Sequence, residues 1–136
     1  MKFKFLIIME KEIIYNSNLH FEHEMWRREL LFWKDELVFF NNRLSELVTR
    51  WTKKEFLVKL EHFQNEFILH GGVIEDLLEA IEIHETRLAG QDLKSHDAMD
   101  TIMVKKHIEF REKMEIQEQI YADLKKDFFR FLTKYL

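Results

Sequence analysis

The sequence predicts an all-α protein, an antiparallel bundle of three long helices with coiled-coil-like seams, which we expect dimerisation to complete. The first observation is composition: the 136 residues contain no proline and only three glycines, so the strongest helix breakers are nearly absent. The second is periodicity, because apolar residues recur at alternating intervals of three and four in three long stretches, which is typical of helices packed along a seam. The third is connection length, because short turns between these stretches force neighbouring helices to run in opposite directions.

Residues 1–16 are expected to form an N-terminal arm that is disordered or that contains a wrongly assigned start. In the second case Met9 is the true first residue and residues 1–8 are not part of the protein. The apolar run at residues 5–9 is shorter than the core of a secretory signal, and no small-residue cleavage site follows it. No apolar run approaches the roughly 18 residues needed to span a membrane. We therefore predict a cytoplasmic protein without a membrane span, in which residues 17–136 form a single helical-bundle domain.

The first helix is predicted over about residues 18–51, where Ser17 and Asn18 are suitable N-cap residues. Its seam has no broken step and consists of Leu19, His23, Trp26, Leu30, Trp33, Leu37, Phe40, Leu44, Leu47 and Trp51. Beside this seam, a second apolar line holds Met25, Phe32 and Phe39, and a third holds Leu31 and Val38. A helix that is apolar over more than its seam usually contacts more neighbours than one three-helix bundle provides.

The second helix is predicted over about residues 53–89. Thr52 and Glu55 have the spacing of a capping box, and Gly90 is predicted to end the helix. Gly71 and Gly72 in its middle each cost about 1 kcal/mol relative to alanine, which favours a kink or a close backbone approach there. The seam consists of Phe56, Leu60, Phe63, Phe67, His70, Ile74, Leu77, Ile81, His84 and Leu88.

The third helix is predicted over about residues 93–136, with a seam of His96, Asp100, Met103, His107, Phe110, Met114, Gln117, Tyr121, Leu124, Phe128, Phe131 and Tyr135. Folding the chain about residues 52 and 90 places Trp51 beside Phe128. This register leaves an aromatic end without a partner in the chain, made of Phe129, Phe131, Leu132, Tyr135 and Leu136. Together with the broad apolar face of the first helix, this end predicts a homodimer or a helical protein partner bound through these two surfaces.

Polar residues occupy several seam positions, and the same register gathers polar side chains into two groups. The first candidate cluster consists of His20, His23, His84, His96 and Asp100, and the second of Glu66, His70 and His107. Helical bundles hold zinc, iron or manganese with imidazoles and carboxylates that point into the core from several helices. Residues 60–86 contain seven acidic side chains and no Lys or Arg, which also favours a cation. In the competing interpretation, the seam histidines are half-polar fillers that fix helix register.

The composition of the chain argues against several classes of function. A net charge of −4 has the wrong sign for a polyanion-binding protein, so we expect no nucleic-acid partner. The absence of cysteine removes thiol catalysis and thiolate metal sites, and the chain has no Gly-rich phosphate loop. We assign no catalytic or cofactor-binding residues, and the sequence leans against an enzyme without deciding the question. The leading hypothesis is a non-enzymatic helical-bundle interaction or oligomerisation module, and the alternative is a transition-metal-binding bundle with seam histidine and carboxylate ligands.

Overall fold

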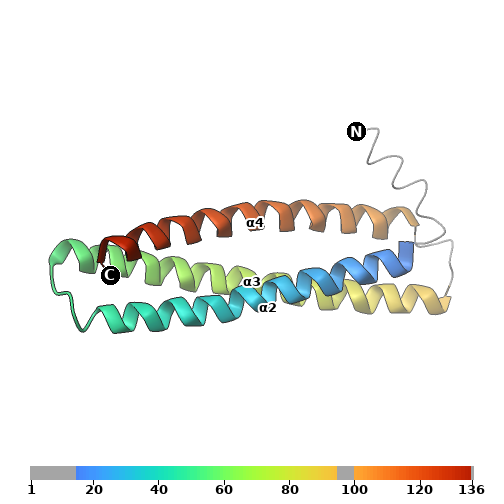
Figure 1. Ribbon diagram of the computed structural model, residues 1–136. Coiled ribbons are helices and arrows are strands. Elements are labelled where there is room, and N and C mark those ends of the chain that lie inside the picture. Colours follow the sequence, from blue (N-terminus) through green and yellow to red (C-terminus); the bar gives the residue numbers. More distant parts are fainter. Residues whose placement is uncertain (1–14, 95–99, 136) are drawn as a thin grey trace.

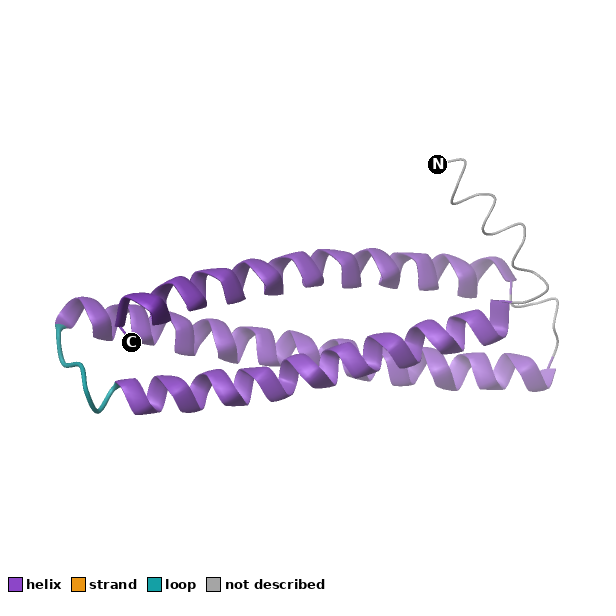
Figure 2. Ribbon diagram, viewed as in Figure 1, coloured by secondary structure: helices purple, strands orange, loops and turns teal. Residues whose placement is uncertain are grey.

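The computed structural model of the protein describes residues 15–94 and 100–135, with side chains described over residues 18–90 and 102–135. Three helices make up this part of the chain: α2 spans Tyr15–Leu47, α3 spans Lys54–Lys94 and α4 spans Asp100–Tyr135 (Figure 1). The described residues contain no strand, which confirms the all-α class for them (Figure 2). No helix among them is long and apolar enough to cross a membrane. Of the predicted arm at residues 1–16, only the last two residues lie in the described part, where they begin α2.

The three helices lie side by side along their length, and a short loop at residues 48–53 joins α2 to α3 (Figures 1 and 2). From its start onward, α2 contacts α3 at ever earlier residues, in the pairs His20–Glu85, Arg27–Glu82 and Lys34–Glu75. It contacts α4 at ever later residues, in the pairs Glu22–His107, Trp33–Tyr121 and Phe40–Phe128. The chain therefore doubles back after α2, and one end of the bundle carries the start of α2, the end of α3 and the start of α4.

The predicted seams form the core. Every seam position whose side chain is described is buried or partly buried, because three helices packed together bury the stripe that recurs every three and four residues. The larger core cluster is rich in phenylalanine toward the α2–α3 loop, where Phe56 and Phe128 are fully buried. A much smaller cluster of Leu19, Leu88 and Val104 lies at the opposite end of the bundle.

The glycines of α3 behave differently from the prediction. Gly90 does not end the helix, which continues to Lys94. A Cβ atom built at Gly71 or Gly72 would meet nothing within 4 Å, so the close approach considered for this pair is absent. None of the described glycines has a positive φ, so an ordinary helical conformation is enough for each of them.

The aromatic end of α4 is a second correction. Trp51 contacts Tyr135, with ring centroids 5.4 Å apart, and not the predicted Phe128. Phe131 stacks on Phe56 at 5.5 Å, and both Phe131 and Tyr135 are buried. Phe129 remains partly exposed against Phe40, Leu132 packs against the core, and Leu136 lies outside the described residues. Because α3 passes Gly90 and ends at Lys94, and α4 begins at Asp100, α4 is shifted along the bundle relative to the prediction. Its aromatic end therefore has partners inside the chain.

Candidate functional site

Three histidines meet in the core near the end of the bundle opposite the α2–α3 loop. We call His23 of α2, His84 of α3 and His107 of α4 the three-histidine cluster. His23 and His107 are 2% and 3% exposed, and His84 is half-buried. The ring centroid of His23 lies 5.1 Å from that of His107 and 5.9 Å from that of His84. Each helix contributes one ring because each histidine holds a seam position at this level of the bundle.

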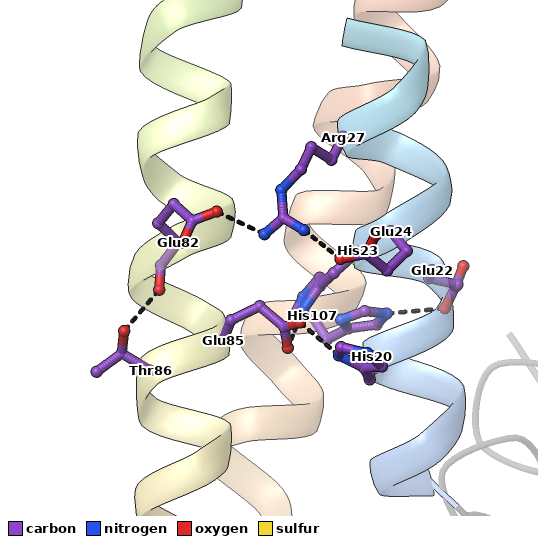
Figure 3. A network of polar contacts seen from close by, with 9 residues as sticks. All are labelled: His20, Glu22, His23, Glu24, Arg27, Glu82, Glu85, Thr86 and His107. Atoms are coloured by element: carbon purple, nitrogen blue, oxygen red, sulfur yellow. Dashed lines mark hydrogen bonds and ion pairs between the residues drawn. The ribbon is translucent and has the colours of Figure 1, made fainter. Parts of the chain in front are cut away.

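Two of these rings each contact a carboxylate through one ring nitrogen (Figure 3). Nδ1 of His23 lies 3.1 Å from Oε2 of Glu85, and Nε2 of His107 lies 2.8 Å from Oε1 of Glu22. Since an ionised carboxylate only accepts hydrogen bonds, these ring nitrogens carry the proton and donate it. The other nitrogens, Nε2 of His23 and Nδ1 of His107, are buried and have no hydrogen-bond partner among the described residues. Buried polar atoms without a partner are uncommon in native proteins, which makes this pair informative.

A small cavity of about 10 Å³ adjoins the three rings. Besides the three histidines, its lining residues are Leu19, Arg87, Leu88, Met103 and Lys106. This volume corresponds to about one water-sized sphere, so the cavity has room for a single small ligand.

The surroundings favour the neutral form of two of the rings. Burial lowers the pKa of His84, and the neighbouring His23 and His107 lower it further. Burial also lowers the pKa of His107, although the Glu22 carboxylate acts in the opposite direction. Burial alone would raise the pKa of Glu22, but hydrogen bonds from His107 and Arg111 lower it to about 2. At neutral pH the site therefore favours uncharged rings for His84 and His107 and an ionised Glu22 carboxylate.

A second group of donors lies outside the core at the same level. His20, Glu24 and Glu85 bring three ligand atoms within 4.8 Å of one another, and no other group of at least three does so in the described part of the chain. Nδ1 of His20 lies 2.5 Å from Oε1 of Glu85, so the two oxygens of this one carboxylate serve both groups. His20 is largely exposed, and Arg27 pairs with Glu24.

The structure brings together only part of each predicted cluster. His20, His23 and His84 of the first cluster lie close to one another, whereas His96 lies outside the described residues. Asp100 is the first residue of α4, and its side chain is outside the described part. His107 was predicted in the second cluster, but it lies beside His23 of the first cluster, because the shift of α4 brings the two residues to the same level of the bundle.

The remaining members of the second cluster stay together. Nε2 of His70 lies 3.6 Å from Oε2 of Glu66, and Nε2 of Gln117 lies 3.3 Å from Nδ1 of His70. Buried His70 therefore has polar partners, as a core histidine of the structural kind would have.

Glu22 is the residue that the sequence reasoning missed. Its position on the flank of the α2 seam resembles that of any solvated glutamate, and only the correct α2–α4 register reveals that it reaches His107 and Arg111. A histidine at a seam position of α4 was the available signal, because a buried imidazole needs a partner from a neighbouring helix.

Comparison of the chain with protein-family models, with curated proteins and with solved structures finds no match.

Proposed function

We propose that the protein is a non-enzymatic assembly module, an antiparallel three-helix bundle that forms a symmetric dimer through the outer face of α2. The observation that carries this proposal is a row of exposed apolar side chains, which we call the outer stripe: Phe21, Met25, Phe32 and Phe39. Their exposed fractions run from 50% at Met25 to 70% at Phe39.

The spacing of the outer stripe supports a packing role. Met25, Phe32 and Phe39 are seven residues apart, so they stay on one side of the helix, away from the buried seam. Single exposed apolar residues are ordinary on protein surfaces, but several large ones on the same face of one helix are typical of an interaction site. Such a row offers a second helix the same kind of contact that the seams make inside the bundle.

The charges within the stripe favour a second copy of the chain as the partner. Arg28 and Asp35 lie in the same row, are exposed, and form no salt bridge within the described part of the chain. When two copies of α2 are placed in opposite directions about a two-fold axis at Phe32, Phe32 meets its own equivalent and Met25 meets Phe39 of the partner subunit. The same axis places Arg28 beside Asp35 of the partner subunit, and symmetry repeats this pair. The surface can thus pair with itself, apolar side chain against apolar side chain and charge against opposite charge.

The experiment that tests this proposal is sedimentation velocity over a range of protein concentrations. The wild-type protein is expected to dimerise, and Phe32→Glu is expected to be monomeric because it buries two charges at the axis. Ile68→Glu is the matched control, because Ile68 is 73% exposed on α3 and lies outside the stripe. Circular dichroism checks that each variant keeps its helix content.

A charge swap identifies the geometry of the dimer. Arg28→Asp and Asp35→Arg should each weaken the dimer by about tenfold or more, since each one places like charges together. The double variant Arg28→Asp with Asp35→Arg should restore the wild-type dissociation constant. A wild-type protein that stays monomeric, or a double variant that is no better than either single variant, would contradict this assembly.

A further inference from the structure

We propose that the three-histidine cluster binds one divalent transition-metal ion of the zinc class in the core of the bundle. Glu22 and Glu85 orient two of the ligand rings. This site goes beyond the assembly function and does not depend on it, because none of its residues belongs to the outer stripe.

The two buried nitrogens without partners are the first argument. Nε2 of His23 and Nδ1 of His107 come from different helices, and both residues line the same small cavity. In a neutral ring whose other nitrogen donates to a carboxylate, the remaining nitrogen carries a free lone pair. Burying two such lone pairs in a core without hydrogen-bond partners costs free energy, and a metal ion that binds both nitrogens removes this cost.

The spacing of the rings is the second argument. Zinc–nitrogen bonds of 2.0–2.1 Å in tetrahedral geometry place the centres of neighbouring imidazoles about 5 Å apart. The observed centroid separations from His23, 5.1 Å to His107 and 5.9 Å to His84, lie near this value. Among the described residues only the outer group of His20, Glu24 and Glu85 already holds three donors within 4.8 Å, so at least one inner side chain must rotate to bring the three histidine donors onto one ion. Half-buried His84 has the most freedom to make this rotation.

The type of ligand and the surrounding charges indicate the class of ion. Three imidazole ligands suit zinc and its neighbours in the transition series, whereas magnesium and calcium prefer oxygen ligands. The carboxylates of Glu22 and Glu85 supply two negative charges behind the rings, in the carboxylate–histidine–metal arrangement that raises ligand basicity. Arg87 and Lys106 also line the cavity, and Arg111 shares Glu22, so these cations oppose the ion and limit its affinity.

Two competing explanations define the controls. A single buried water could donate to both free nitrogens, since the cavity has about the size of one water. The exposed outer group could instead bind the ion by itself, although Arg27 already pairs with Glu24 there. Binding of one metal ion per chain would exclude the first explanation. Separate variants of His107 and His20 show whether the ion binds the three-histidine cluster or the outer group.

The experiment uses the full chain without an affinity tag, stripped with EDTA and titrated with Zn²⁺ by calorimetry and with Co²⁺ by visible absorption. We expect one ion per chain and the absorption of tetrahedral Co²⁺. His23→Gln and His107→Gln should abolish this absorption, and Glu22→Gln should weaken binding by about 10–100-fold. His70→Gln is the matched control, because His70 is equally buried in the core but lies in the Glu66 and Gln117 environment.

Three results would overturn the site. They are the absence of Zn²⁺ and Co²⁺ binding by the wild-type protein, retention of the Co²⁺ spectrum in His107→Gln, and its loss in His20→Ala. If His107→Gln loses its helix content, His84→Gln replaces it, since a half-buried side chain tolerates substitution more readily. The monomeric Phe32→Glu variant should bind the metal normally, so failure of the dimer and failure of the metal site are separate results.

Discussion

At the scale of single residues, two carboxylates that face each other between α2 and α4 make stability depend on pH. Burial and the neighbouring Glu118 raise the pKa of Glu29 from 4.5 to about 7. The folded state therefore prefers the protonated acid, whereas the unfolded chain ionises near pH 4.5. The stability that this group contributes is therefore present below pH 4.5 and is lost as the pH rises through about 7.

Glu29→Gln tests this pH dependence, because glutamine imitates the protonated acid at every pH. We expect the variant to unfold with the same free energy as the wild type at pH 4.5, and to be more stable at pH 8 by about 0.2–1 kcal/mol, the range for partly exposed charges. Urea denaturation at the two pH values measures both quantities. Glu115→Gln, at an exposed position of α4, should show no such dependence. Equal effects of Glu29→Gln at both pH values would contradict the prediction.

At the scale of helices, the seams could be predicted from the sequence but their relative register could not. Residues such as Leu44 and Phe67 repeat at the helical period, and burial follows directly from that period. Register depends on where the chain reverses, and Gly90 was a misleading signal because glycine is tolerated inside a helix at a cost of about 1 kcal/mol. A shift of a turn or two moved His107 from one predicted cluster to another, so the candidate site was only partly predictable.

The same helix provides a stability prediction. Since a Cβ atom at Gly71 or Gly72 meets nothing within 4 Å and neither residue has a positive φ, alanine fits both positions without strain. Gly71→Ala with Gly72→Ala should raise the free energy of unfolding by about 1–2 kcal/mol, because alanine restricts the unfolded chain more than glycine does. Urea denaturation measures the change. The reverse substitution Ala89→Gly, at an exposed position of α3, should lower stability by about 1 kcal/mol. A double variant whose free energy of unfolding is no higher than that of the wild type would contradict the prediction.

At the scale of the whole molecule, the described side chains at the two ends of the bundle differ in how much apolar surface they bury. The end near the α2–α3 loop is filled by aromatic rings of the larger core cluster, whereas the other end has the small cluster of Leu19, Leu88 and Val104 beside the polar histidines. Local stability follows the density of buried apolar contacts. The end that carries the proposed metal site is therefore expected to unfold more easily than the other end when no metal is bound. A metal ion bound there would link the three helices at the end where apolar packing stabilises them least.

Two tryptophans report on these two ends. Trp26 contacts His107 at the histidine end, with ring centroids 5.0 Å apart, and Trp51 contacts Tyr135 at the aromatic end at 5.4 Å. In EDTA, a variant that keeps only Trp26 should lose its native fluorescence at a lower urea concentration than one that keeps only Trp51, with phenylalanine at the other positions. Circular dichroism of both variants provides the global transition for comparison. Coincident transitions for both tryptophans would show that the bundle unfolds as one unit and that the histidine end is as stable as the rest. Addition of Zn²⁺ should bring the Trp26 transition to that of Trp51, because an ion that binds only the folded cluster stabilises the end that otherwise opens first.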